Sequence, residues 1–464
     1  MPMPADRSED LNLRLPQRVH IVGICGAGMS AIALVLRSMG HTVSGSDLKE
    51  SPVAVRLRSQ GIDVAIGHRP ENVGAVDAVT FSPAVAATNP EIVAAASRGA
   101  RVVPRSGMLA AICATRRCLA VAGTKGKTTT ASMLSLILIE AGLRPSFLIG
   151  ADVNEVGTNA VWDAGEWLVV EADESFGTFQ ELRPDWAIVT NVASDHLDHY
   201  GTFPRLRAAF DTFVGQATQG SVVSADDDEA AGIGRGRGSL SVGTAAGATF
   251  VMTDVALHRS SSAFTLAGPE GALGLVTLGV PGLHNVRNAA LAVASALQVG
   301  VSFAAAAVAL ARFTGVTRRF EFRGERNGVT FVDDYAHLPF AVEAALATAR
   351  SGGWSRIVAV FQPHRYTRTA ELAGPFGSAF ADADLLVVTD VYGAGEAPIP
   401  GVSGRLIADA VRDQDQRLPV VYASSWDELH RVLGSVLAPG DLCLTMGAGD
   451  LTMLPDELLE SPQW

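Results

Sequence analysis

The chain has 464 residues, of which 48% are hydrophobic and 18% are charged, so it can form about three domains with buried cores. This composition excludes bulk disorder. The 36 Lys and Arg residues against 48 Asp and Glu give a formal net charge of −12, and no basic stripe interrupts this acidic balance. We therefore expect no nucleic-acid partner.

The cysteines and the hydropathy pattern indicate where the protein works. Cys25, Cys113, Cys118 and Cys443 lack the spacing of a disulfide framework or a metal site. The start of the chain is polar, without the apolar core of a signal peptide, and no uncharged apolar run reaches the roughly 20 residues of a membrane span. We expect a cytoplasmic protein without membrane insertion.

The first predicted unit is a βαβ motif. A buried strand at Val19–Ile24 leads into the glycine-rich turn Gly23–Gly28, a helix at Met29–Met39 and a second strand at His41–Ser46. Asp47 follows, about twenty residues beyond the turn, where a Rossmann fold places the ribose partner. The motif predicts a Rossmann-like domain. On this turn alone, a ligand-free fold and a nicotinamide dehydrogenase also fit.

A second glycine turn follows the predicted strand Cys118–Ala122. The segment Gly123–Thr129 has the pattern G-x-x-G-K-T and opens a long apolar helix, Thr128–Ala141. Glycines let backbone N–H groups approach phosphate oxygens at a helix start, Lys127 can reach the β- and γ-phosphates, and the Thr128 hydroxyl can bind Mg²⁺. The turn predicts a nucleoside triphosphate site, with a domain boundary near residues 112–117.

Two further predicted strands end in polar clusters. Trp167–Val170 is followed by Glu171, Asp173 and Glu174, and Trp186–Thr190 by residues 191–199, which include His196. Ligands of open α/β sheets lie at the carboxyl ends of strands. A carboxylate of the first cluster is a candidate magnesium ligand, and His196, flanked by acids, is a candidate metal ligand.

The rest of the chain predicts two different architectures. Ser239–Val280 alternates Val, Thr and Ser between glycine turns, which favours short antiparallel strands, and the acidic run Asp226–Glu229 before it predicts a solvated loop. From Gly315 a third α/β block predicts a parallel sheet. Its strands are expected at Val329–Val332, Ile357–Phe361, Leu385–Thr389, Val420–Tyr422 and Leu442–Thr445.

Together these elements predict an α/β protein of three domains. They are a Rossmann-like domain at 1–115, a central P-loop ATPase domain with a small antiparallel sheet at 116–314, and a Rossmann-like domain at 315–464. In the third block, Asp333–His337 and Gln362–Thr369 each follow a strand. The second of these is a dense basic loop in an acidic protein, suited to capturing a carboxylate or phosphate.

These motifs together resemble the Mur ligase family of peptidoglycan synthesis, in family order and over nearly the whole chain. The stretches that carry the resemblance are His20–Ser30, Gly123–Thr130, Glu171–Ser175, Thr190–His196, Gly282–Asn288, Arg318–Glu321, Asp333–His337, Gln362–Thr369 and Thr445–Asp450.

The resemblance implies an ATP- and Mg²⁺-dependent ligation. The lactyl carboxylate of UDP-N-acetylmuramate would attack the γ-phosphate, and the amino group of L-alanine would attack the resulting acyl phosphate, leaving ADP and phosphate. A monomer or weak homodimer is expected. The cofactor-binding residues implied are Gly123, Thr124, Lys125, Gly126, Lys127, Thr128, Thr129, His284, Asn285, Asn288, Arg319 and Asp334. The substrate-binding residues implied are Gly23, Gly26, Ala27, Gly28, Met29, Ser30, Asp47, Tyr335, His337, Arg365 and Arg368.

The resemblance also assigns chemical roles. The catalytic residues implied are Lys127, Glu171, Glu174, His196, His337 and Arg368, and the metal ligands implied are Thr128, Glu171 and His196. The chain departs from the family pattern at Cys25, Lys125, Phe176 and Leu338, with Phe340-Ala341 beyond. Two alternatives therefore stay open: a sister ligase with glycine, serine or a murein peptide as acceptor, and a non-catalytic paralogue that binds sugar nucleotides.

Overall fold

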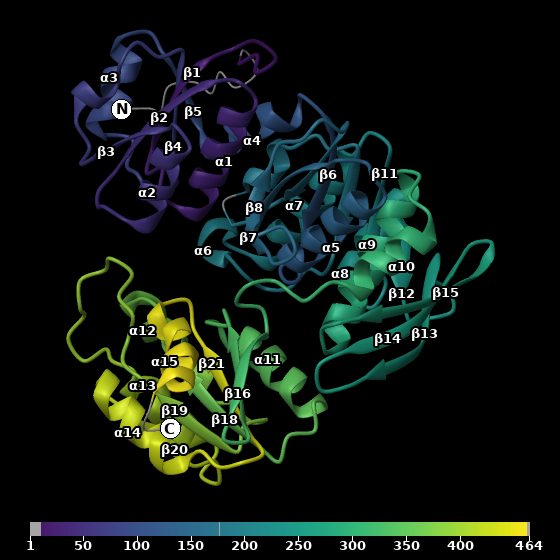
Figure 1. Cartoon of the computed structure of the whole chain (residues 1–464), viewed down its shortest axis with the longest axis vertical. Helices are drawn as coiled ribbons and strands as arrows, with labels where there is room; N and C mark the ends of the chain where they lie inside the picture. Colours follow the sequence, from purple (N-terminus) through teal and green to yellow (C-terminus); the bar gives the residue numbers. More distant parts are fainter. Residues whose placement is uncertain (1–10, 176, 462–464) are drawn as a thin grey trace. The chain divides into compact units, whose positions relative to one another are not determined.

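The computed structural model describes residues 11–175 and 177–461, and its strands form three sheets (Figure 1). The chain divides into two compact units. The first comprises the described residues up to Val255 with 263–278 and 284–314, and the second comprises 256–262, 279–283 and the described residues from Gly315. The predicted boundary at 315 coincides with a unit boundary. The division at 115 falls inside the first unit and stays a prediction.

The N-terminal sheet is parallel, in the order β3-β2-β1-β4-β5. Its strands are β1 Arg18–Val22, β2 Thr42–Asp47, β3 Asp63–Ile66, β4 Ala78–Phe81 and β5 Arg101–Pro104. Its helices are α1 Ala27–Ser38, α2 Pro52–Ser59, α3 Pro90–Ser97 and α4 Arg105–Cys113, with the 3-10 turn η2 at Pro70–Asn72. The predicted βαβ unit is confirmed, and the first glycine turn lies at the carboxyl end of β1.

The central sheet has ten strands in the order β15-β14-β13-β12-β11-β10-β6-β9-β7-β8. Its strands are β6 Arg117–Ala122, β7 Ser146–Val153, β8 Thr158–Val161, β9 Trp167–Glu171, β10 Trp186–Val189, β11 Gly220–Ser224, β12 Leu240–Gly243, β13 Phe250–Leu257, β14 Ser262–Gly268 and β15 Gly271–Leu278. Its helices are α5 Lys127–Glu140, α6 Leu197–Tyr200, α7 Phe203–Gly215, α8 Asp228–Arg237, α9 Leu283–Gln298 and α10 Phe303–Ala311, with η3 at Thr178–Glu181.

Two expectations for this region need correction. The strand β12 pairs in parallel with β11 and with β13, so the stretch from Ser239 is not purely antiparallel. The acidic run is not a solvated loop either. Asp227 caps the start of α8, accepting the Ala230 N–H at 2.8 Å, while the Asp226 carboxylate pairs with Arg287 at 2.9 Å. The Asp227 cap is a local contact, whereas the Asp226–Arg287 pair joins residues 61 positions apart, which no local pattern reveals.

The third sheet runs β16-β17-β21-β18-β19-β20. Its strands are β16 Glu321–Arg326, β17 Val329–Asp334, β18 Arg356–Phe361, β19 Leu385–Val388, β20 Val420–Tyr422 and β21 Asp441–Met446. Its helices are α11 Pro339–Ser351, α12 Tyr366–Phe376, α13 Arg405–Gln414, α14 Trp426–Val436 and α15 Leu454–Glu460, with η4 at Asp450–Met453. The five predicted parallel strands are confirmed, and the unpredicted β16 adds an antiparallel edge.

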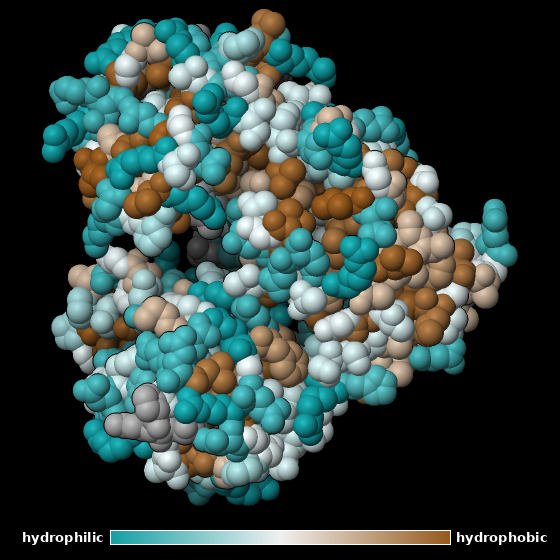
Figure 2. All heavy atoms as spheres, in the orientation of Figure 1, coloured by the Kyte–Doolittle hydropathy of each residue, from teal (hydrophilic) through white to brown (hydrophobic). Residues whose placement is uncertain are grey.

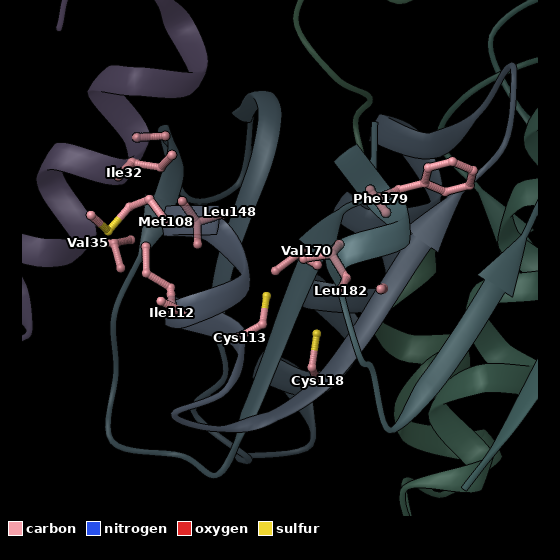
Figure 3. Close-up of a cluster of buried hydrophobic side chains, with 14 of the residues drawn as sticks. Ile32, Val35, Met108, Ile112, Cys113, Cys118, Leu148, Val170, Phe179 and Leu182 are labelled. Carbon is pink, nitrogen blue, oxygen red and sulfur yellow. The ribbon is translucent and has the colours of Figure 1, made fainter. Parts of the chain in front are cut away.

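Helix α4 shares a continuous apolar core with both sheets of the first unit. Met108 and Ile112 on α4 lie with Ile32 of α1 and with Leu148 of β7 in one buried cluster (Figure 3). Cys113 and Cys118 are also buried there as free thiols, as expected from the sequence. This shared core fixes the start of α4 between the first glycine turn and the central sheet.

The surface is mostly mixed in polarity. Apolar side chains gather over α10 and β15, where Val308 and Leu275 are exposed (Figure 2). No helix among the described residues is long and apolar enough to cross a bilayer.

Candidate active site

The second glycine turn joins β6 to α5, as predicted. Gly126 precedes the helix with a φ of 80°, a left-handed conformation that favours glycine. The Asn191 side chain fixes the turn from the next strand, because its Oδ1 accepts the Lys125 N–H at 2.9 Å and its amide donates to the Lys125 carbonyl at 2.9 Å. The turn is therefore held in shape by its neighbour in the sheet.

Lys127 is surrounded by the predicted carboxylates. Its ammonium contacts both Glu174 carboxylate oxygens, at 2.8 and 3.0 Å, and donates to the Gly123 carbonyl at 2.7 Å. Burial alone would lower the pKa of Lys127, but the negative charges of Glu174, Glu171 and Asp173 outweigh burial and raise that pKa. Lys127 is therefore a permanent cation in a site shaped for anions.

The acids beside Lys127 are held in different ways. Glu174 is almost fully buried, and its carbonyl accepts the Tyr200 hydroxyl at 2.6 Å. Glu171 accepts the Gly150 N–H at 2.7 Å. Burial would raise the pKa of Asp173, but the Lys127 charge and the hydrogen bonds from Ser175 keep it lowered. Burial raises the pKa of Glu174 despite the Lys127 charge. A lysine among carboxylates suits a site for phosphate and a divalent cation.

Two of the predicted metal ligands, Thr128 and Glu171, offer the oxygen donors that Mg²⁺ prefers, whereas His196 offers a nitrogen. Thr128 begins α5 next to Lys127, and Glu171 ends β9, the strand beside β6. His196 follows β10 with a left-handed φ of 52° and lies 3.8 Å from the Asp195 carboxylate. Among the described residues, no three His, Cys, Asp or Glu side chains gather closely enough to form a metal site without other donors. The metal assignment stays a prediction.

The start of α9 lies at the phosphate turn. A Cβ built on Gly126 would clash with the Asn288 amide, so Asn288 contacts the turn itself. Asn285 at the same helix start is buried, and the preceding His284 is exposed. An imidazole and two amides at this helix start are compatible with the predicted nucleotide contact.

The first glycine turn has its own acid. The Asp47 carboxylate accepts the Cys25 N–H at 2.9 Å, and the Ser46 carbonyl accepts the Gly23 and Ile24 N–H groups. Met29 and Ser30 are almost fully buried at the start of α1. Of the remaining predicted contacts, Gly26 is exposed, and Ala27 belongs to the first turn of α1.

A buried carboxylate that the sequence did not reveal stabilises this region. Glu91 on α3 is fully buried and accepts hydrogen bonds from Ser46, from Asn72 at 2.5 Å and from the Arg69 N–H at 3.1 Å. Burial alone would raise the pKa of Glu91, but these donors and His20 lower it to about 2. Because Ser46 also accepts the N–H groups of the first turn, Glu91 supports that turn indirectly.

The second unit contains a polar cluster of its own. Asp334 accepts the Phe320 and Ala336 N–H groups at 2.8 and 2.7 Å, and burial raises its pKa despite the nearby Arg319 charge. Tyr335 and His337 have ring centroids 5.2 Å apart.

His364, which the sequence did not single out as a site residue, joins this cluster. Its ring lies 5.8 Å from that of His337 and stacks on Tyr392. Arg368 donates to its Nδ1 at 3.0 Å, and burial together with the Arg368 charge lowers the pKa of His364 to about 4. Arg365 is exposed at the start of α12. The structure thus gathers His337 and Arg368 around one neutral imidazole, while Phe176 lies outside the described residues.

A Rossmann-like sheet followed by a phosphate-turn sheet and a further parallel sheet defines a nucleotide-binding α/β protein. Comparison with family models makes this assignment specific. Residues 18–117 match the Mur ligase family catalytic domain, 121–296 the Mur ligase middle domain, and 318–449 the Mur ligase glutamate ligase domain. The chain belongs to the Mur ligase family.

Similar proteins cover nearly the whole chain. It is 44% identical to UDP-N-acetylmuramate–L-alanine ligase of Geobacter sp. over 96% of this chain and 97% of that protein. It is also 44% identical to the ligase of the same name from Saccharopolyspora erythraea, over 96% and 93%.

Two solved structures also cover nearly the full length. UDP-N-acetylmuramate-alanine ligase from Thermotoga maritima matches with a TM-score of 0.81 at 30% identity, over 96% of this chain and 98% of that one. A murein peptide ligase from Psychrobacter arcticus matches with a TM-score of 0.70 at 26% identity, also over 96% and 98%.

Proposed function

We propose that this protein is an ATP-dependent ligase that joins L-alanine to the lactyl carboxylate of UDP-N-acetylmuramate, in peptidoglycan precursor synthesis. The observation that carries the choice of substrates is 44% identity to ligases of that name across 96% of the chain. The site supports the same chemistry, because Lys127 stands as a cation at a glycine-rich turn of the phosphate-binding type, beside several carboxylates.

Different residues of the chain bind the triphosphate and the divalent cation. The Thr124 and Lys125 N–H groups already donate to Asn191, so the remaining backbone N–H groups of Gly123–Thr129 and the Lys127 ammonium hold the triphosphate. They stabilise the charge that develops on the transferred phosphoryl group. Thr128, Glu171 and His196 would hold Mg²⁺, which when bound supplies positive charge to the phosphate oxygens. Because the substrate carboxylate itself attacks, forming an acyl phosphate that the amine then opens, no nucleophile from the protein is needed.

The remaining assignments follow the same proposal. The UDP moiety is bound by Gly23–Ser30 and Asp47. ATP is contacted by His284, Asn285 and Asn288, and also by Arg319 and Asp334. The amino-acid site is formed by Tyr335, His337, Arg365 and Arg368. We place the reaction in the cytoplasm, where ATP is supplied, and assign it to a monomer or weak homodimer, because one chain carries every residue proposed.

The test is release of inorganic phosphate from ATP with Mg²⁺ and UDP-N-acetylmuramate, across L-alanine, glycine, L-serine and a short murein peptide. Release with L-alanine only is the expected result, and chelation of divalent cations should abolish it. Release with the peptide only would identify the sister activity, which the match to a murein peptide ligase makes the second candidate. No release with any acceptor, from folded ATP-binding protein, would overturn the proposal.

A further inference from the structure

Arg105, which no motif singled out, has its guanidinium against the first glycine turn. It is the first residue of α4, directly after β5. A Cβ built on Gly28 would lie 2.6 Å from its Nη2 and 2.7 Å from its Cζ. Because Gly28 belongs to helix α1 and does not have a positive φ, its missing side chain makes room for this guanidinium rather than for an unusual backbone.

The same side chain also faces the acids of the central sheet. Arg105 lines a cavity of about 20 Å³ together with Glu171, Asp173 and Thr178, large enough for roughly one water molecule. Its positive charge is one of the effects that keep the pKa of Asp173 lowered. Arg105 thus stands between the turn assigned to the sugar nucleotide and the acids assigned to the metal.

The hydrogen-bonding capacity of Arg105 is unused by the protein. Its guanidinium is half-buried, yet within residues 11–175 and 177–461 it makes no ion pair within 4.0 Å and no hydrogen bond. A guanidinium carries five N–H donors in a planar fork, and holding it partly out of water without partners costs free energy. A structural arginine would be expected to donate to a carbonyl or carboxylate nearby.

We propose that Arg105 binds an anionic group of the sugar nucleotide, either its diphosphate or its lactyl carboxylate, at the point where the first turn meets the acid cluster. This inference rests on the proposed function. The planar fork matches both oxyanions with two parallel hydrogen bonds. A cation there also offsets the repulsion between an incoming anion and the carboxylates Glu171 and Asp173, which the substrate must approach to react.

The test is calorimetric binding, without ATP, of two ligands to the full chain and to the Arg105→Met variant. UDP-N-acetylmuramate carries both anionic groups, and UDP-N-acetylglucosamine carries only the diphosphate. We expect Arg105→Met to weaken UDP-N-acetylmuramate binding at least tenfold. An equal loss for both ligands assigns the diphosphate, and a loss for UDP-N-acetylmuramate alone assigns the carboxylate. Affinity for UDP-N-acetylmuramate within twofold of wild type overturns the inference.

Two further variants guard against a purely structural effect. Arg105→Lys keeps the charge but loses the fork, so we expect a several-fold loss with an unchanged melting temperature. Arg56→Met removes an exposed arginine of α2 and should leave both affinities unchanged. In turnover assays Arg105→Lys should raise KM for the sugar nucleotide and leave KM for ATP unchanged. Failure of the wild-type chain to bind UDP-N-acetylmuramate would instead refute the proposed function.

Discussion

The two glycine turns have the same local architecture but obtain their positive charge differently. Each joins a buried parallel strand to a helix, β1 to α1 and β6 to α5. The second turn carries its cation within its own sequence, as Lys127, held by Glu174. The first turn has no lysine or arginine, and the guanidinium beside Gly28 comes from α4 instead. Equivalent turns can therefore become anion sites either by local sequence or by tertiary packing.

The same contrast holds for the side chain that fixes each turn. Asp47, at the end of β2, accepts the Cys25 N–H at 2.9 Å, whereas Asn191, after β10, accepts the Lys125 N–H at 2.9 Å. An amide satisfies the N–H without adding negative charge beside a triphosphate. A carboxylate at the first turn can in addition accept hydrogen bonds from ribose hydroxyls. Four predictions use this contrast.

The largest effect is expected at Lys127. Lys127→Met should lower ATP-dependent phosphate release by at least about a thousandfold, because the charge that stabilises the transferred phosphoryl group is lost. It should also reduce the free energy of unfolding by about 3 kcal/mol, since Glu174 is left buried without a counter-charge. Adding Glu174→Gln should recover most of the stability and none of the activity. Turnover of Lys127→Met within tenfold of wild type would contradict the phosphate-site assignment.

Stability of the first turn should depend on Glu91. Glu91→Gln should lower the free energy of unfolding, measured with urea at pH 7, by about 2–3 kcal/mol. The reason is that a neutral amide cannot accept all the hydrogen bonds that converge on the carboxylate. Its folded pKa of about 2 lies below the ordinary value, so its contribution is present above about pH 4.5 and is lost as the pH falls toward 2. The difference in the free energy of unfolding between Glu91→Gln and wild type should therefore become smaller as the pH is lowered.

The matched control for this prediction is Asp409→Asn, which breaks an exposed ion pair with Arg412 on α13. It should change stability by less than about 0.5 kcal/mol. A cost for Glu91→Gln no larger than that of the control would mean that the buried carboxylate does not stabilise the turn.

Alanine variants of Gly126 and Gly28 should differ in whether a second substitution restores their stability. Gly126→Ala should cost about 1–2 kcal/mol, because its φ of 80° disfavours a side chain, and Asn288→Ala should not restore that loss. The three atoms nearest to a Cβ at Gly28 all belong to the Arg105 guanidinium, so Arg105→Ala should restore the stability that Gly28→Ala loses. Melting temperatures of the four single and two double variants measure both effects. If the second substitution restores the stability of both glycine variants, or of neither, the two glycines do not differ in the way proposed.

The smallest effect is expected from exchanging a carboxylate and an amide at Asp47 and Asn191, the side chains that fix the two turns. Asn191→Asp places a carboxylate beside the phosphates and loses the N–H to the Lys125 carbonyl, so ADP binding should weaken about tenfold, equivalent to about 1.4 kcal/mol. Asp47→Asn keeps an oxygen that accepts the Cys25 N–H. It should leave the affinity for ADP unchanged and weaken the affinity for the sugar nucleotide. Calorimetric titration of both ligands distinguishes the variants, and equal effects on ADP would contradict the division of roles.

Much of the fold follows from local sequence pattern. The strand, turn and helix around Lys127 were predicted within one or two residues, because a short apolar run, two glycines and a long apolar segment each have one favourable backbone conformation. The strands β3, β7, β8, β11 and β16 were missed, and the pairing of β12 was wrong. β7 and β8 pair with each other, and β16 and β12 pair with strands next to them in the chain, so distance along the chain does not explain these errors. Strand formation and pairing depend on packing within the sheet rather than on the residues of one strand.

The sequence by itself determined the order of the three sheets, the position of both glycine turns and the identity of Lys127, because these features depend on neighbouring residues. Only the tertiary structure revealed Arg105 against Gly28, the neutral His364 between His337 and Tyr392, and Glu91 with its donors. His20 and Glu91, for example, are 71 residues apart in the chain. Such groups meet because parallel strands bring distant loops to one sheet edge, and burial there then decides their charge.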